Sequence, residues 1–377
     1  MLSIRMSASG PGRMTMEAMT MLDDILTLWL EERAEALDAD AALAGALVPR
    51  LALAQIFKTG VPASAGGSGD KPSAAIGVVA DLARYSMSAA FVFWAQRALI
   101  ECVLASPNRA LVQRLLPSLL AGELAGAPGL SNAMKFLGGL GQLQTRFTSD
   151  AHGFTLDGRV SWATNLQRQG FVLALAAGNQ EGTDTSVFAV PSDADGLTRE
   201  PDLDLTGLRG TSTAVLRLAG VRLGEDWQLH PQAKAFLPGI RPMFVGMQCG
   251  LGLGLARASL RAARAALDDG RSVLLGELEA LEAQVRDLWE ALSTGVDSGR
   301  LRERPPELLG LRMRMVEIAT DAVQLELQAL GGRAYLRGEN GGFARRWCEA
   351  AFLPVVTPTL AQLKAEFARA QVTGTVG

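Results

Sequence analysis

Residues that bind metals or form disulfides are scarce in this 377-residue sequence, which contains two histidines and three cysteines. Cys102, Cys249 and Cys348 lie far apart, and no Cys-x-x-Cys or His-x-x-x-His pair occurs, so the sequence predicts neither a metal site nor a disulfide scaffold. A chain without disulfides is typical of a reducing compartment, and we expect a cytoplasmic protein. His152 and His230 have no neighbouring Ser, Cys or Asp pattern that would indicate a catalytic triad.

An excess of one charge is also missing, since 36 basic and 39 acidic residues give a formal net charge of −3. Without a basic surplus, the sequence does not predict a nucleic-acid-binding protein. No apolar run reaches the roughly 18–20 residues that span a bilayer, so we expect no membrane association. The most apolar stretch, Phe244 to Ala258, is interrupted by Gln248 and by glycines. Residues 1–18 lack a sustained apolar segment and are expected to form a flexible leader.

Apolar residues make up 48% of the chain and charged residues 20%, which is enough apolar mass for a packed core. The length exceeds that of one compact core, so we expect two or three subdomains. Helical spacing of apolar residues predicts helices over 19–53, 74–104 and 108–120, with a loop rich in glycine and proline at 59–72.

Between residues 142 and 223 the apolar period shortens to two, and turn signals such as Asp157-Gly158 separate the segments. This pattern predicts a small antiparallel β domain. After Pro238 the helical period returns, with one helix ending at Gly331-Gly332 and a last helix over 360–370. The expected organisation is a helical domain at 19–122, a β domain at 123–232 and a helical bundle at 233–377.

Glycines spaced by four residues occur at Gly246, Gly250 and Gly254. A dinucleotide-binding loop is the tempting interpretation, but the spacing is wrong and no strand precedes it. We therefore expect these glycines to let one helix lie close to another, within the chain or at a subunit interface.

The most informative string runs from Gly153 to Asn165 and contains Trp162 and Thr164. It resembles the strand pair G-Y-x-L-N-G-x-K-x-W-I-T-N of the acyl-CoA dehydrogenase superfamily of flavoproteins. The resemblance implies that Trp162 packs beside the isoalloxazine ring and that the Thr164 hydroxyl lies near flavin N5. A flat ring needs an aromatic wall, and a buried ring nitrogen needs a polar partner. The alternative is a hairpin with an ordinary core tryptophan.

Further strings in the same order as in the family extend the resemblance from about residue 51 to 371. They are Gly60-Val-Pro62 with Gly66-Gly67, then Gly122-Glu123, then Gly207 to Thr213 (compare G-x-R-x-S-x-T), then Gln328-Ala-Leu-Gly331-Gly332 (compare Q-x-x-G-G). In the family, the last string approaches the FAD pyrophosphate of a neighbouring subunit, so the resemblance implies cofactor contacts from Gln328, Gly331 and Gly332. Taken alone, that string is also a common helix end.

The family resemblance implies a mainly α fold with a central antiparallel β domain and a C-terminal four-helix bundle. It also implies FAD as cofactor, a small-molecule substrate such as an acyl-CoA, and a homodimer or homotetramer built through the bundle. A family member of this kind transfers a hydride from its substrate to flavin N5 while a glutamate removes a proton.

The customary positions of that glutamate are both without a carboxylate here. Thr357 stands at the first, and residues 240–245, where some members keep the base, contain none. A threonine hydroxyl does not act as a general base at neutral pH without help.

Two cofactor-binding strings are also altered. The flavin-binding loop [S/T]-E-P-x-x-G-S-D is represented by residues 131–138, in which Ser131 alone is kept. The string R-x-x-F-G is represented by residues 268–272, where Arg271 is the one arginine that could take the phosphate-binding role.

Three functions remain open from the sequence. The first is an FAD-dependent oxidoreductase that acts on an acyl thioester or similar substrate with the base missing or relocated. The second is a flavin monooxygenase on the same fold, in which a small hydroxyl at Thr357 leaves room for a bulkier substrate. The third is a non-catalytic relative that keeps the fold as a binding or structural subunit.

Overall fold

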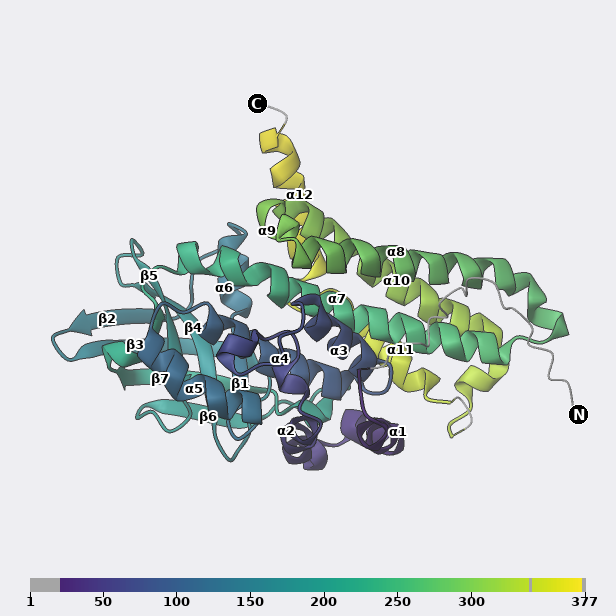
Figure 1. Cartoon of the computed structure of the whole chain (residues 1–377), viewed down its shortest axis with the longest axis horizontal. Helices are drawn as coiled ribbons and strands as arrows, with labels where there is room; N and C mark the ends of the chain where they lie inside the picture. Colours follow the sequence, from purple (N-terminus) through teal and green to yellow (C-terminus); the bar gives the residue numbers. More distant parts are fainter. Residues whose placement is uncertain (1–20, 339–340, 375–377) are drawn as a thin grey trace, which may run out of the picture.

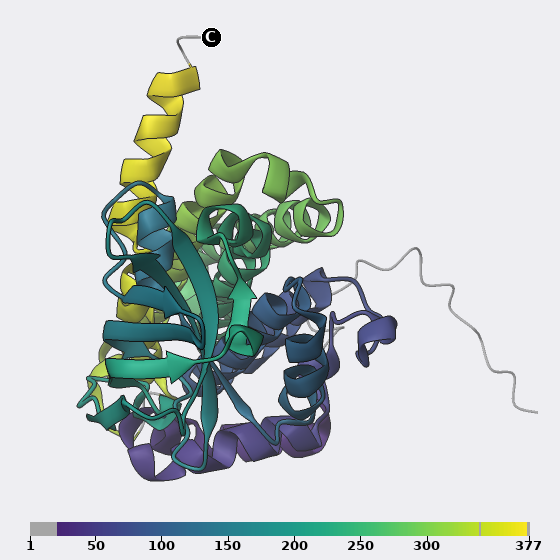
Figure 2. The same cartoon turned by 90° about the vertical axis from the view of Figure 1, so that its left-hand side faces the viewer.

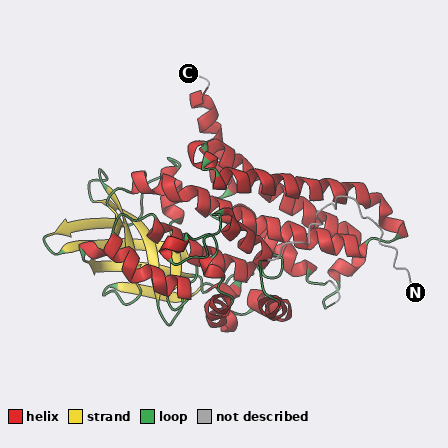
Figure 3. Ribbon diagram, viewed as in Figure 1, coloured by secondary structure: helices red, strands yellow, loops and turns green. Residues whose placement is uncertain are grey.

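The computed structural model describes residues 21–338 and 341–374, so the expected leader at 1–18 lies outside the described residues. The sheet lies at one end of the long axis with α5 (Arg109–Ala121) and α6 (Ser131–Leu137) beside it, and the longest helices extend to the other end (Figures 1 and 3). Helices precede and follow the sheet in the chain. The mainly helical fold with a central β domain, predicted from the sequence, is therefore confirmed.

The first third of the chain is helical. Its helices are α1 (Asp24–Ala39), α2 (Ala44–Leu53), α3 (Ser73–Ala83), α4 (Met87–Leu104) and α5 (Arg109–Ala121). Side chains cap several of them: Asp23 accepts from the backbone N–H of Leu26, and Asn108 from that of Leu111. The expected continuous helix over 19–53 is instead divided, because the Asp40 side chain caps the next short turn and ends α1.

The middle of the chain forms a twisted eight-stranded sheet, which lies at the end of the molecule that faces the viewer in Figure 2. Its strands are β1 (Ala125–Gly129), β2 (Arg146–Asp150), β3 (Gly153–Ala163), β4 (Phe171–Asn179), β5 (Thr185–Pro191), β6 (Leu197–Asp202), β7 (Ala214–Leu223) and β8 (Gln228–His230). The strand order is β6-β7-β3-β2-β4-β5-β8, with β1 beside β4. The short helix α6 (Ser131–Leu137) connects β1 to β2.

The sheet is mixed, which corrects the expectation of a purely antiparallel domain. Strand β4 pairs in parallel with both β1 and β2, whereas the other pairs are antiparallel. Only antiparallel neighbours can be joined by a tight turn, and β1 and β2 reach β4 through longer connections.

The last third of the chain forms the helical bundle. Its helices are α7 (Ala233–Ala266), α8 (Leu275–Asp297), α9 (Arg300–Glu303), α10 (Pro305–Leu330), α11 (Phe343–Phe352) and α12 (Leu360–Gly374). Helices α7, α8 and α10 lie side by side, and α12 projects from the body (Figure 1). Gly331, with φ of +58°, follows α10 as predicted from the sequence.

The glycine row of α7 packs against α3 within the same chain. A Cβ atom at Gly250 would lie 2.8 Å from the carbonyl oxygen of Ile76, and one at Gly254 would lie 2.1 Å from that of Ala80. No larger residue fits without moving a helix, so the prediction of close helix packing is confirmed.

Helices α4 and α7 are long and apolar enough, by length and composition alone, to cross a membrane. In their most apolar windows, 83% and 94% of the residues are buried inside the fold. Both helices therefore have the burial that is typical of core helices in a folded domain.

Candidate functional site

A cavity of about 640 Å³ lies where the sheet meets α4 and α11. Strand β3 and the residue after it supply Trp162 and Thr164, and α4 supplies Phe91 and Trp94. The remaining walls are the loop before β7, the second half of α11 and the segment that follows α11. Their lining residues are Leu205, Thr206, Gly207, Leu208, Thr211, Thr213, Cys348, Ala351, Phe352, Val355, Val356, Thr357 and Thr359, together with Pro128 and Ser131.

Four of the residues predicted as a site from the sequence line this cavity together: Ser131, Trp162, Thr164 and Thr357. Trp162 is 57% exposed although it belongs to a strand. A tryptophan in a filled core would be covered, so the alternative of an ordinary core tryptophan is wrong. Its indole is instead an open wall of the cavity.

A smaller pocket of about 220 Å³ adjoins the first, since Ser131, Trp162 and Thr357 line both. Its walls are more polar. Lys135 and Arg159, both exposed, are its two cationic side chains. An anionic group would be favoured in this pocket.

The other predicted residues, Gln328, Gly331 and Gly332, lie at the end of α10 and do not line the cavity. A Cβ atom at Gly331 would lie 3.3 Å from Nη2 of Arg271. The structure thus brings the candidate phosphate-binding arginine to the glycine pair. Gly332 has open space beside it.

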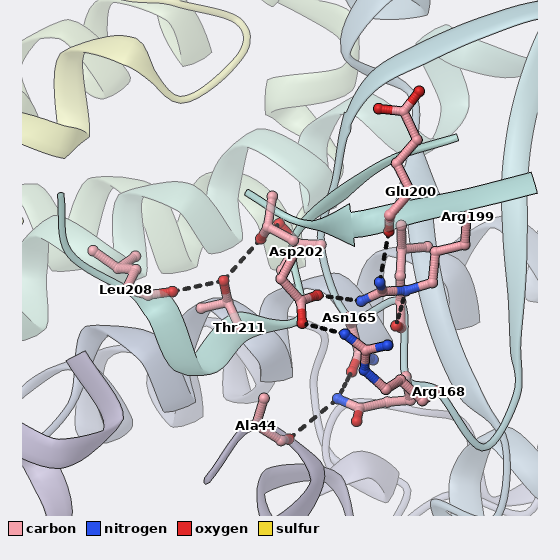
Figure 4. A network of polar contacts seen from close by, with 12 residues as sticks. Ala44, Asn165, Arg168, Arg199, Glu200, Asp202, Leu208 and Thr211 are labelled. Carbon is pink, nitrogen blue, oxygen red and sulfur yellow. Dashed lines mark hydrogen bonds and ion pairs between the residues drawn. The ribbon is translucent and has the colours of Figure 1, made fainter. Parts of the chain in front are cut away.

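Three buried threonine hydroxyls form a chain along one cavity wall. Thr164 Oγ1 lies 2.9 Å from Thr213 Oγ1, which lies 2.8 Å from Thr211 Oγ1. Thr211 Oγ1 in turn donates to the carbonyl oxygen of Leu208 at 2.7 Å, the contact visible in Figure 4. Polar atoms along an otherwise apolar wall fix the orientation of a bound molecule.

The backbone around this chain is held in an unusual conformation. Asn165, Leu208 and Ser212 have φ values of +67°, +57° and +48°, a region that residues other than glycine rarely adopt. Asn165 follows Thr164, Ser212 lies between Thr211 and Thr213, and Leu208 belongs to the same loop as the last two. Such strain persists only where the surroundings enforce it, and it gathers at functional sites.

Hydrogen bonds from elements far apart in the sequence enforce this conformation. The backbone N–H of Leu208 donates to Asp38 Oδ1 on α1 at 2.7 Å. The backbone N–H of Asn165 donates to Thr211 O at 3.0 Å. The Asn165 amide also donates to Gln96 Oε1 on α4 and to Gly126 O in β1, each at 3.0 Å.

The opposite wall, residues 353–357, is held at both ends by buried side chains. Arg312 Nη2 donates to Leu353 O at 2.8 Å, and Gln248 Nε2 donates to Thr357 O at 2.9 Å. Arg312 is 1% exposed and has no ion pair among the described residues. Leu353 is the C-cap of α11, so the arginine faces the negative end of that helix.

Aromatic side chains form the floor of the cavity. The rings of Phe91 and Trp94 stack with centroids 4.9 Å apart, and Phe352 meets Phe91 edge-on at 5.1 Å. Trp94 Nε1 donates to Phe244 O at 3.1 Å, which fixes the indole. Sequence reasoning missed these three residues because their spacing is that of any buried helix.

Among the described residues, no Asp, Glu or His lines the cavity. Carboxylates lie directly behind its wall instead. A Cβ atom at the lining residue Gly207 would be 3.0 Å from Asp38 Oδ1 and 3.1 Å from Cys348 Sγ. Burial raises the pKa of the Asp38 carboxyl and of the Cys348 thiol, so the thiol stays neutral.

The carboxyl of Glu349 belongs to the same group. It accepts from Arg345 Nη1 at 2.6 Å and from the backbone N–H of Met87 at 3.2 Å, and it is 1% exposed. Burial raises its pKa as well. Both contacts fall on Oε1 and tie the carboxyl to α4 and to Arg345, whereas Oε2 is buried without a hydrogen-bond partner among the described residues.

Comparison with known proteins shows what this chain is similar to. Residues 17–123 match the family described as acyl-CoA dehydrogenase, N-terminal domain. The probable acyl-CoA dehydrogenase YngJ of Bacillus subtilis is 27% identical over 60% of this chain, and the match spans 63% of that relative, less than two thirds of its length.

Two solved structures extend the likeness to nearly the whole chain. One is a glutaryl-coenzyme A dehydrogenase in complex with glutaryl-CoA, with a TM-score of 0.78 and 19% identity, covering 93% of this chain and 96% of that one. The other is KijD3 in complex with FMN and a dTDP-linked amino sugar, with a TM-score of 0.77 and 20% identity, covering 93% and 91%. At these identities the structures establish a common fold.

The N-terminal family match, the similarity to dehydrogenases and the common fold agree with the strings found in the sequence. Together these findings support the resemblance of the chain to the acyl-CoA dehydrogenase superfamily.

Proposed function

We propose that this protein is an FAD-dependent oxidoreductase that acts on a small apolar substrate, an acyl thioester or a similar molecule. The observation that carries the proposal is the cavity of about 640 Å³, which has an open indole, a row of buried hydroxyls and, among its described lining residues, no carboxylate or imidazole. It has the aromatic and apolar character of cofactor sites, with a few convergent polar groups.

The residues of the cavity fit a flavin ring. Trp162 offers a flat apolar face, Thr164 offers a hydroxyl, and Ser131 lies at the junction with the smaller pocket. When bound there, FAD would supply hydride acceptance. The protein residues that line the cavity would orient the ring, hold the substrate against it and keep water away from the aromatic floor.

The pyrophosphate end of FAD is assigned to Arg271, Gly331 and Gly332, which lie outside this cavity. We propose that these residues serve the site of a second subunit in a homodimer or homotetramer. The arginine supplies charge, and the glycines allow the backbone to approach a phosphate closely.

Thr357 is the residue at the customary base position, and its role in the proposal is to line the site without removing a proton. Since the carboxyls of Asp38 and Glu349 are engaged behind the wall, α-proton removal from a thioester lacks a positioned base. We expect acyl-CoAs to reduce the flavin slowly, and an absence of bleaching with every acyl chain length would contradict an acyl thioester as the substrate.

A second candidate is a flavin-dependent monooxygenase, favoured by the same lack of a base and by the aromatic floor of Phe91, Trp94 and Phe352. Its test is to mix the reduced holoprotein rapidly with oxygen and a set of aromatic substrates. An oxygen atom incorporated into a product supports it, and simple reoxidation without product contradicts it.

The proposal of a flavin site is tested by the absorbance spectrum of the purified protein together with two tryptophan variants. Trp162→Ala should weaken FAD binding by roughly tenfold or more, because it removes the wall of the ring. Trp347→Ala is the matched control, since Trp347 is also exposed (43%) but does not line the cavity. A colourless protein that takes up no FAD would instead support the non-catalytic relative.

We further propose that the protein is soluble and cytoplasmic.

A further inference from the structure

The direction of the hydrogen bonds in the threonine chain follows from its end point. A carbonyl oxygen only accepts, so the single hydroxyl proton of Thr211 is used by Leu208 O. Thr213 must then donate to Thr211 across their 2.8 Å contact. Thr213 has no second proton, so Thr164 must donate to Thr213 across the contact of 2.9 Å.

The consequence appears at the cavity end of the chain. With its proton directed to Thr213, Thr164 presents lone pairs to the cavity and no donor. Thr164 is 6% exposed, and no other described group donates to its hydroxyl. An acceptor held in a nearly dry wall favours a ligand that places an N–H or O–H opposite it.

The loop around the threonines keeps this direction fixed. Leu208, whose carbonyl ends the chain, has a left-handed backbone and is tied through its N–H to Asp38 at 2.7 Å. Reversing the chain would turn the Thr211 hydroxyl away from Leu208 O, which would keep only the backbone N–H of Thr211 at 3.2 Å. The direction inferred from the Leu208 carbonyl oxygen therefore has one more hydrogen bond than its reverse.

We propose that this polarised chain makes the cavity select the hydrogen-bearing form of its ligand, so that Thr211 and Thr213 are positioning residues acting through Thr164. The inference rests on the proposed function. For a flavin with N5 opposite Thr164, the ring carries hydrogen at N5 only when it is reduced. The three threonines therefore favour binding of the reduced ring over the oxidised ring, which raises the midpoint potential of the bound flavin.

The experiment compares midpoint potentials of FAD bound to the purified wild type and to Thr211→Val, measured by reductive titration against reference dyes. In the variant, Thr213 no longer has a fixed acceptor, so the Thr164 hydroxyl is free to donate into the cavity. The ratio of oxidised-form to reduced-form dissociation constants should fall roughly fivefold, which is a lowering of about 20 mV for a two-electron couple.

Three further variants keep the result specific. Thr211→Ser retains the hydroxyl and should restore the wild-type potential. Thr213→Val breaks the chain one step earlier and should lower the potential as Thr211→Val does, which covers the case in which the first variant fails to fold. Thr320→Val removes the same kind of bond, from a threonine to the carbonyl oxygen of Val316 at 2.8 Å on α10, and should leave the potential unchanged.

Equal potentials in the wild type and in both valine variants, or a raised potential in them, would overturn the inference and leave the flavin proposal standing. A wild-type protein that binds no flavin overturns both. A lowered potential in the valine variants with rescue by serine supports the polarised chain.

Discussion

The cavity and the region directly behind its α11 wall differ sharply in charge. The cavity is lined by aromatic, aliphatic and hydroxyl groups, whereas Glu35, Asp38, Arg345 and Glu349 gather behind it. Gly207 is the thinnest part of the wall, because Asp38 lies next to the place that a side chain would occupy. Carboxyl groups are therefore close to the site and yet kept out of it.

The comparison explains why the cavity lacks a base. In the group behind the wall, Asp38 holds the backbone of Leu208, and Glu349 holds Arg345 and the start of α4. These carboxyls are used to build the wall, so releasing one for proton transfer would break a structural contact. The carboxyls nearest to the site therefore support its wall.

The largest expected effect comes from placing a carboxylate inside the cavity, which removes the difference in charge between the cavity and the group behind its wall. Thr357→Glu puts a general base at a lining position, and general-base catalysis typically contributes about 10²–10⁴-fold in rate. We expect acyl-CoA substrates to bleach the flavin of this variant at least about a hundredfold faster than that of the wild type, measured anaerobically by stopped flow.

Thr357→Gln is the matched control, because it has the size of the glutamate without its basicity. If the glutamine variant is accelerated as much as the glutamate variant, the effect comes from the shape of the site. If neither is accelerated with any acyl chain length, Thr357 does not occupy the base position.

Breaking the group behind the wall should show that its role is structural. Glu349→Ala leaves Arg345 buried without its main partner and leaves the backbone N–H of Met87 without an acceptor. We expect a loss of about 3–5 kcal/mol in the free energy of unfolding by urea denaturation. The exposed pair of Glu32 and Arg33 gives the control, since Glu32→Ala should cost less than about 1 kcal/mol. Equal losses in the two variants would contradict the structural role.

The smallest expected effect is a pH dependence of the unfolding free energy that comes from Asp38, behind the cavity wall. Because burial raises the pKa of the Asp38 carboxyl, the folded state binds a proton at Asp38 more readily than the unfolded state. Stability from this group therefore falls as pH rises from the ordinary carboxyl pKa through the raised one. Arg345 and Glu35 face Asp38 and lower and raise that pKa respectively, as weaker effects.

Asp38→Asn keeps an oxygen to accept from Leu208 and removes this titration. The variant should match the wild type at the acidic end of that window and become relatively more stable toward neutral pH. Urea denaturation at a series of pH values measures this difference. A difference that does not change with pH would show that Asp38 has no raised pKa.

Much of the fold could be predicted from the sequence, because it depends on local patterns. The alternating segments around Phe154 and Val187 form strands, and the glycine pair at 331–332 ends a helix. Strand β1 was not predicted, since Ala, Gly and Pro residues have little strand propensity. It forms because Gln96 on α4 accepts from the N–H of Gly126 and β4 pairs with it.

The candidate site could be predicted where a string of residues carries it, as with Trp162 and Thr164. It could not be predicted where distant segments meet. Asp38 approaches Leu208 across 170 residues, and nothing near either residue indicates that contact. Phe91 and Trp94 have the spacing of core residues, and only the space beside them makes them a floor.

Helix α7 has two duties that bind the site to the bundle. Its glycines lie against α3, and between Gly246 and Gly250 it carries Gln248, whose amide holds the carbonyl oxygen of Thr357. Any residue larger than glycine at 250 or 254 meets the α3 backbone and displaces one helix from the other, and the displacement reaches Thr357 through the Gln248 side chain. The position of Thr357 at the rim of the cavity therefore depends on the contact between α3 and α7. A redesign of the pocket has to keep that contact.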